Sequence, residues 1–209
     1  MSGVEPGPDG KPRCFWALGT DDYLDYHDNE WGRPLHGENE LYERLTLEAF
    51  QSGLSWLTIL RKRENFRRAF DGFDAERVAA YGSKEVERLL GDAGIVRHRG
   101  KIAATVNNAR RYLELIDESG SLAAYLWSFE PDPTTRPMRL DRDALLTMDA
   151  TAESTALSKD LRRRGWAFVG PTTVYAAMQA MGIVDDHLEG CFSRPIVEDE
   201  RARFVRPAA

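Results

Sequence analysis

The pattern of apolar positions predicts helices along most of the chain. The clearest stripe predicts a helix from about residue 98 to about residue 117, and its members are Ile102, Val106, Leu113 and Ile116. The other helices that we expect cover, in chain order, 38–52, 54–70, 83 to about 91, 121–129, 158–164 and 172–181. Because no strand alternation and no internal repeat accompanies these helices, the sequence predicts an all-α fold.

Three segments lack this periodicity. Residues 1–12 hold three prolines and three glycines and predict a flexible tail. The stretch 131–150 begins with PDPTTRP and predicts a loop, and the mostly charged stretch 193–209 predicts a poorly ordered C-terminal tail.

Composition narrows the class of protein. At 209 residues, with 42% hydrophobic and 30% charged residues, the chain fits one large domain or two small interleaved ones. No apolar run is long enough to span a bilayer, and no N-terminal apolar segment is typical of a secretory signal. We therefore expect a cytoplasmic protein without a membrane partner, and a monomer by default.

Charge has two readings. The net charge of −6 disfavours a protein coated with nucleic acid, yet basic residues gather at 61–68, 97–101, 110–111 and 159–164. Each cluster alone fits a solvated helix face with acids nearby. Several such clusters on one acidic chain favour a local basic patch.

Residues near the two ends of the chain could bind a metal. Cys14 and His27 lie near the N-terminus, and His187 and Cys191 are four residues apart, which places them on one face if they lie on a helix. Two thiolates and two imidazoles form the tetrahedral set that zinc prefers in closed structural sites. Two buried thiols without a metal are the alternative, because ordinary zinc modules carry tighter local pairs.

A second candidate feature is a turn between two helices at about 158–181. A basic helix ends at Gly165, and Pro171 suits the first turn of the next helix. The amides at that helix N-terminus, with the hydroxyls of Thr172 and Thr173, could bind a phosphate of DNA. A plain corner in a helical bundle is the other reading.

Several long blocks together resemble the DNA-3-methyladenine glycosylase I family from about Arg13 to about Cys191. The blocks are CFW, YHDNEWG, LEAFQSGLSWLTIL, KRENFRRAF, DAGIVRHRGKI, LSKDLRRRGWAFVG and the final DH…C. The resemblance implies a helix–hairpin–helix DNA glycosylase fold with one structural Zn²⁺ bound by residues from both ends. The implied parts are a zinc module of 13–37 plus 175–192 and a helical domain of 38–174.

The resemblance also assigns roles to residues. Its zinc ligands fall on Cys14, His27, His187 and Cys191, and its phosphate-binding hairpin spans Gly165 and Gly170 to Thr172 and Thr173. The carboxylate that recognises the damaged base falls on Glu48, and the aromatic pocket falls on Tyr26, Trp56, Tyr23 and Trp16. From the residues alone, Glu48 could equally be a solvated glutamate, and core packing would explain Tyr26 and Trp56.

The implied activity is hydrolysis of the N-glycosidic bond of 3-methyladenine in double-stranded alkylated DNA, with free 3-methyladenine as product. A base methylated at N3 is cationic, so electron-rich rings and a desolvated carboxylate would favour it over normal adenine. The nucleotide must leave the base stack to be reached. Asp185 and Asp186 are candidates to support the sugar cation. The main alternative is a non-catalytic, zinc-stabilised DNA-binding module.

Overall fold

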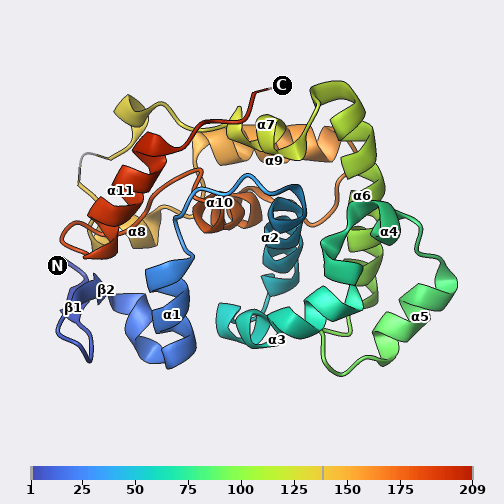
Figure 1. The fold of residues 1–209 in the computed structure, drawn as a ribbon, viewed down its shortest axis with the longest axis horizontal. Coiled ribbons are helices and arrows are strands. Elements are labelled where there is room, and N and C mark those ends of the chain that lie inside the picture. The colour runs from blue at the N-terminus through green and yellow to red at the C-terminus, as the bar shows by residue number, and fades with distance from the viewer. Residues whose placement is uncertain (1, 138, 209) are drawn as a thin grey trace.

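The computed structural model describes residues 2–137 and 139–208, which are mainly α-helical (Figure 1). The chain begins with strands β1 (Val4–Pro6) and β2 (Pro12–Cys14), the 3₁₀ helix η1 (Phe15–Gly19) and α1 (Asp21–Asn29). It continues through α2 (Glu38–Gln51), α3 (Trp56–Ala69), η2 (Asp71–Phe73), α4 (Ala75–Ala79), α5 (Ser83–Gly91), α6 (Arg99–Ser119) and α7 (Leu122–Trp127). The last part contains η3 (Pro133–Thr135), α8 (Arg142–Thr147), α9 (Ala152–Arg163), α10 (Pro171–Ala180) and α11 (Ser193–Arg203).

Helix α2 lies at the centre of the molecule (Figure 1). It contacts α3, α6, α7 and α10, and every residue from 41 to 50 is buried. A helix that is buried on all sides must hold its charged residues among packed side chains, where a charge without a partner is costly. Glu48 lies in this stretch.

The long periodic segments form helices as the sequence predicts. Helix α3 begins after Ser55, whose hydroxyl oxygen accepts a hydrogen bond from the Thr58 amide at 3.3 Å. Helix α5 confirms the helix expected at 83–91, and Gly82 occupies its N-cap. The amide of Gly82 donates to the Glu85 carboxylate at 2.9 Å, which closes this helix start.

The structure corrects the loop expected at 131–150. This stretch contains η3 and α8, and Asp141 caps α8 by accepting from the Ala144 amide at 3.0 Å. Helix α8 has only six residues, too few to reveal a helical period in the sequence.

The structure also corrects both expected tails. Residues 4–6 pair with 12–14 in an antiparallel hairpin, and 193–203 form α11. Helix α11 buries only Ser193 and Val197, and Arg201 on it pairs with Glu130 at 2.7 Å. Because its stabilising contacts are to residues far along the chain, local composition did not reveal it.

Segments near the two ends of the chain lie on one side of the molecule, where β1, β2, α1, α8 and α11 gather (Figure 1). The Phe192 amide donates to the Pro12 carbonyl at 2.8 Å, and the Leu188 amide donates to the Cys14 sulfur at 3.3 Å. These contacts bring the two cysteines together. No helix within the described ranges combines the length and apolar character needed to cross a membrane.

Candidate active site

A pocket of about 430 Å³ opens beside α2, with walls from η1, α1, α3, α8 and α10. All five residues expected to bind the base line this one pocket: Trp16, Tyr23, Tyr26, Glu48 and Trp56. Two stretches of the sequence, 16–26 and 48–56, are therefore brought around one pocket.

Aromatic rings form much of the pocket wall. Tyr26 on α1 packs against Trp56 at the start of α3, with ring centroids 5.4 Å apart. Trp16 packs edge-on to Tyr23 at 6.0 Å, and the Tyr23 hydroxyl oxygen accepts from the Leu57 amide at 3.1 Å. The indole N–H of Trp56 is buried and has no hydrogen-bond partner among the residues that the structure describes.

The carboxyl of Glu48 is the acidic group of this pocket. It is 5% exposed, and no group in residues 2–137 or 139–208 forms a hydrogen bond or ion pair with it. Burial raises the pKa of Glu48 to about 8, and the charge of Arg44, one helical turn away, opposes that rise. An arriving cation would favour the ionised form and lower this pKa.

Sequence reasoning missed several pocket residues. Leu145, Leu146 and Met148 come from α8 and the residue after it, in the stretch that was expected to be a loop. Gln51 and Gln179 add amide groups from α2 and α10. No periodicity or motif singles out a glutamine at a helix end, so neither amide carried a signal in the sequence.

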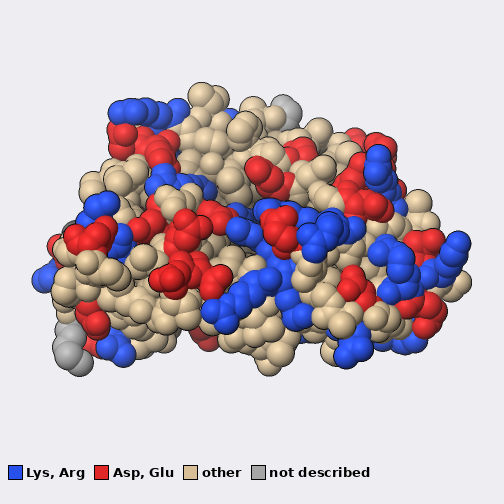
Figure 2. Space-filling view, turned by 60° about the horizontal axis from the view of Figure 1, so that its bottom comes forward, with Lys and Arg blue, Asp and Glu red and all other residues tan. Residues whose placement is uncertain are grey.

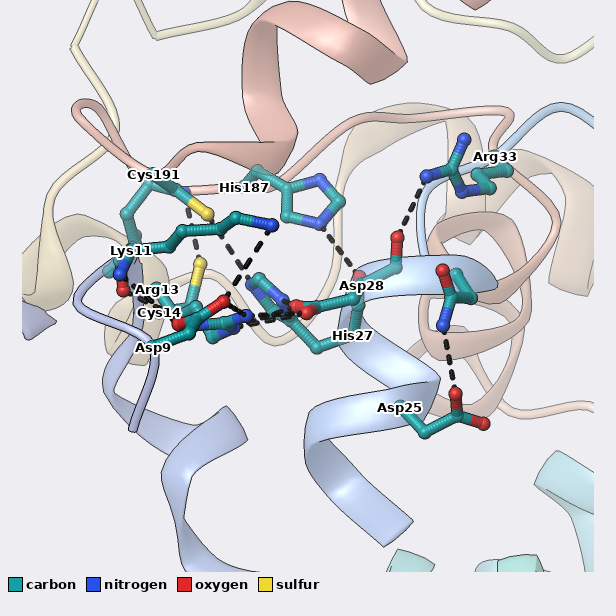
Figure 3. A network of polar contacts seen from close by, with 12 residues as sticks. Asp9, Lys11, Arg13, Cys14, Asp25, His27, Asp28, Arg33, His187 and Cys191 are labelled. Atoms are coloured by element: carbon teal, nitrogen blue, oxygen red, sulfur yellow. Dashed lines mark hydrogen bonds and ion pairs between the residues drawn. The ribbon is translucent and has the colours of Figure 1, made fainter. Parts of the chain in front are cut away.

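The candidate metal ligands also converge. The ligand atoms of Cys14, His27 and Cys191 lie within 4.8 Å of one another, and all three residues are buried. Figure 3 shows both sulfur atoms and the His27 ring pointing toward one another, with His187 beside them. The ring of His187 packs edge-on to that of His27 with centroids 4.9 Å apart, but it lies outside the tight group of three.

Groups behind the two histidines orient their rings. His27 Nδ1 lies 2.8 Å from Asp28 Oδ1, and His187 Nδ1 lies 2.7 Å from Asp185 Oδ1. Carboxylates behind the far ring nitrogen are typical of metal-binding histidines, because they leave Nε2 as the ligand atom. Gly32 has φ +79°, and a β-carbon there would lie 2.9 Å from His187 Cε1, so glycine allows this ring to pack closely.

The side chains of Cys14, His27 and Cys191 are of the types that bind zinc in structural sites. A hydrogen bond between the two cysteines lowers the pKa of the Cys191 thiol and raises that of Cys14. His27 Nε2 lies 3.4 Å from the Cys191 sulfur. His187 and Cys191 lie in the loop before α11 rather than on a helix, so the helical spacing expected for them is wrong although both reach the cluster region.

Two tryptophans connect the cysteine–histidine cluster to the pocket. Trp16 packs against His27 at 5.2 Å and against Trp31 at 4.9 Å, and Trp31 packs against His187 at 4.8 Å. Both indoles also line the pocket. The cluster therefore supports one aromatic wall from behind.

Asp185 and Asp186 do not line this pocket. Asp185 holds His187, and Asp186 is fully buried against Arg136, Tyr175 and Gln179. Asp185 therefore has its partner outside this pocket, whereas Asp186 lies behind one lining residue of the pocket, Gln179.

The predicted corner between two helices is formed by α9, the loop 164–170 and α10. Gly165 ends α9 with φ +83°, and Gly170 is the N-cap of α10. The Asn107 amide donates to the Gly165 carbonyl at 2.8 Å, and the Ser158 hydroxyl donates to the Val169 carbonyl at 2.6 Å. These bonds fix the loop and leave Thr172, which is exposed, at the free N-terminus of α10.

Most of the basic clusters are neutralised within the fold. On α3, Arg61 pairs with Asp22, and Arg63 pairs with Glu30. Figure 2 shows Lys and Arg interleaved with Asp and Glu across one face of the molecule. Arg162 differs, because it is exposed and has no ion-pair or hydrogen-bond partner in the described part of the chain. Its Nη2 would lie 3.4 Å from a β-carbon on Gly170, so it sits at the N-terminus of α10.

Known proteins match this chain over most of its length. A family model described as methyladenine glycosylase matches residues 16–194. DNA-3-methyladenine glycosylase 1 of Escherichia coli (strain K12) is 45% identical over 183 residues, which cover 88% of this chain and 97% of the relative. A DNA-3-methyladenine glycosylase of Haemophilus influenzae is 41% identical over 180 residues, which cover 86% of this chain and 96% of the relative.

Solved structures match the fold as well. A crystal structure of 3-methyladenine DNA glycosylase I aligns with a TM-score of 0.78 at 45% identity and covers 86% of this chain and 98% of that one. A structure concerned with 3-methyladenine recognition by the Staphylococcus aureus enzyme aligns with a TM-score of 0.78 at 39% identity, covering 86% and 95%. A variant of 3-methyladenine DNA glycosylase I in complex with 3-methyladenine aligns with a TM-score of 0.80 at 37% identity, covering 88% and 97%.

Proposed function

The chain belongs to the methyladenine glycosylase family, and we propose that it hydrolyses the N-glycosidic bond of 3-methyladenine in alkylated double-stranded DNA. The observation that carries this proposal is the unpaired carboxyl of Glu48 inside a pocket of aromatic rings. Relatives named for the same activity support it.

The pocket is suited to a cationic base. The rings of Tyr26 and Trp56 present electron-rich faces, each worth about 0.5–2 kcal/mol toward a cation depending on desolvation. Glu48 becomes a carboxylate when such a cation arrives, and a carboxylate can accept a hydrogen bond from the base edge. A neutral adenine gains neither contribution, so the pocket selects the alkylated base by charge.

The target base is reached by turning the nucleotide out of the duplex. Water then attacks C1′, and the base departs with the electrons of the glycosidic bond, which neutralise its positive charge. The proton of the attacking water passes to solvent. Glu48 acts by binding the cationic base, without taking a proton.

We assign the DNA backbone contact to a helix–hairpin–helix formed by α9 and α10. Gly165 and Gly170 shape the loop, and the free amides of α10, with Thr172 and Thr173, bind a phosphate. The unpaired guanidinium of Arg162 adds a positive charge at the same helix end.

We assign one structural Zn²⁺ to Cys14, His27, His187 and Cys191. The convergence of three of them and the carboxylates behind both histidines support this assignment. Bound zinc supplies stability rather than hydrolytic chemistry, because four protein ligands leave no position for water. In the proposed enzyme it joins the two chain ends behind the Trp16–Trp31 wall.

Chelation tests the structural role of the metal. A strong chelator should lower the melting temperature by several degrees, and Zn²⁺ added back should restore it. Circular dichroism measures folding while base release is followed in the same samples. Loss of excision in a protein that keeps its fold and melting temperature would refute a purely structural role.

Release of free base from methylated duplex DNA tests the proposed activity. The wild-type protein should release 3-methyladenine, as measured by chromatography of the soluble products. A non-catalytic DNA-binding module would bind the DNA in a gel-shift assay and release nothing. That second result would overturn the proposal.

A further inference from the structure

The most constrained polar group of the pocket is the amide of Gln179. Asp186, 0% exposed, accepts a hydrogen bond from Gln179 Nε2 at 2.6 Å and one from the Tyr175 hydroxyl at 2.5 Å on the same oxygen. Its other oxygen accepts from Arg136. Gln179 is also anchored through its main chain, because the Gly32 amide donates to its carbonyl at 3.1 Å.

This network fixes which way the amide points. A carboxylate paired with an arginine offers only acceptors, so the NH₂ group of Gln179 must face Asp186. The amide oxygen Oε1 is then on the other side of the group. Since Gln179 lines the same pocket as Glu48, the pocket gains an acceptor whose polarity cannot be reversed without breaking the network.

The other groups of the pocket that can accept a hydrogen bond lack this constraint. Glu48 is an acceptor when ionised and can donate when protonated, and its pKa of about 8 allows both forms. Gln51 can turn its amide either way, because its side chain has no hydrogen-bond partner in the part of the chain that the structure describes. The hydroxyl hydrogens of Tyr23 and Tyr26 can rotate.

We propose that Gln179 Oε1 accepts a hydrogen bond from the exocyclic 6-amino group of the bound base, with Asp186 as the residue that positions it. Gln179 then selects methylated 6-amino purines over methylated 6-oxo purines. The inference rests on the proposed function and adds to it a preference among methylated purines. A 6-oxo purine would place a second acceptor opposite Oε1, and two desolvated acceptors without a hydrogen between them are unfavourable.

The test compares excision of 3-methyladenine and 3-methylguanine from duplex DNA as a ratio of kcat/KM values. Gln179→Met keeps the side-chain length and removes the acceptor. We expect this ratio to fall about tenfold in Gln179→Met, mainly through slower excision of 3-methyladenine. Gln51→Met is the matched comparison, and its ratio should stay within about twofold of wild type. An unchanged ratio in folded Gln179→Met would overturn the inference.

Asp186→Asn tests the positioning. With its oxygen held by Arg136, the new asparagine would present its NH₂ group to Gln179, and the amide of Gln179 would reverse. The ratio should then fall as in Gln179→Met, a change that loss of stability alone would not produce. Tyr175→Phe keeps the carboxylate and should keep the ratio. If Asp186→Asn does not fold, Gln179→Met decides.

The two proposals fail in different ways. Wild-type protein that releases neither base would overturn the proposed function itself. Wild-type protein that releases 3-methyladenine, with a preference that Gln179→Met retains, would overturn only the role of Gln179.

Discussion

Two glutamates on α2 have equal exposure and opposite surroundings. Glu43 and Glu48 are each 5% exposed. Glu43, at the interface with α3, accepts two hydrogen bonds from Arg67, at 2.9 Å from Nε and 2.8 Å from Nη2. Glu48, in the pocket, has no such partner among the described residues, and burial raises its pKa to about 8.

The difference shows that burial alone does not mark a binding residue. A buried carboxyl with a two-pronged arginine partner is part of the internal packing of charges. A buried carboxyl without one stays protonated at neutral pH or waits for an external cation. Of the two glutamates, only Glu48 lacks an arginine partner, and it lines a pocket where a ligand can reach it.

The largest effect that we expect concerns the pH dependence of folding. Because the pKa of Glu48 rises from 4.5 to about 8 on folding, the native protein binds more protons than the unfolded chain between those values. The contribution of the Glu48 carboxyl to the free energy of unfolding is fully present below pH 4.5 and is lost as pH rises through 8. Glu48→Gln should therefore gain stability over wild type, by a few kcal/mol, as pH rises from 5 to 9.

Urea unfolding at several pH values measures this gain. Glu43→Gln is the control, and its curve should keep the wild-type pH slope in the same window because Glu48 is intact. Parallel curves for wild type and Glu48→Gln would show that the pocket carboxyl is not perturbed, and the comparison of the two glutamates would lose its basis.

The next effect is on excision. Glu48→Gln should lower kcat/KM for 3-methyladenine by roughly 10- to 100-fold, because a hydrogen bond to a charged group contributes about 1.5–3 kcal/mol. Glu43→Gln should leave kcat/KM within about twofold of wild type. It should instead lower the free energy of unfolding by about 1 kcal/mol, a modest loss because the Arg67 side chain is 37% exposed. Equal losses of excision in both variants would remove the distinction.

The sequence predicted the parts of the fold that depend on local periodicity. Helices α2, α3 and α6 are long, and their apolar stripes cover many turns. Helix α1 was missed because its buried residues are Tyr26 and His27, which carry no apolar stripe. The β1–β2 hairpin was missed because each strand has only three residues, too few to show an alternating pattern. Helix α11 was missed because it buries only Ser193 and Val197 and so has no apolar stripe.

The site was predictable to the extent that residue type defines it. The family blocks drew attention to cysteines, histidines and aromatic residues, and the structure brings five predicted residues around one pocket and Cys14, His27 and Cys191 into one group. The hydrogen-bond partners of these residues were not predictable from the sequence. Arg67 donates to Glu43, 24 positions away, rather than to Glu48, and Gln179 donates to Asp186, seven positions away. The distinction between the two glutamates is thus a property of the folded chain.

The smallest effect that we expect concerns an exposed charge, that of Arg162, rather than a buried carboxyl. Arg162 has no partner within the described ranges and lies at the N-terminus of α10, whereas its neighbour Arg163 pairs with Asp160. Arg162→Gln should weaken binding to any duplex about threefold and reduce the salt dependence of binding by about 0.9, the value for one phosphate contact.

Fluorescence anisotropy with unmodified DNA at several salt concentrations measures both quantities. Arg163→Gln is the matched control and should change neither, because its charge is already compensated. If the two variants weaken binding alike, then pairing does not determine which charges of this protein reach DNA. The contrast between Glu43 and Glu48 would in that case hold only for buried groups, where the loss of solvent makes a missing partner costly.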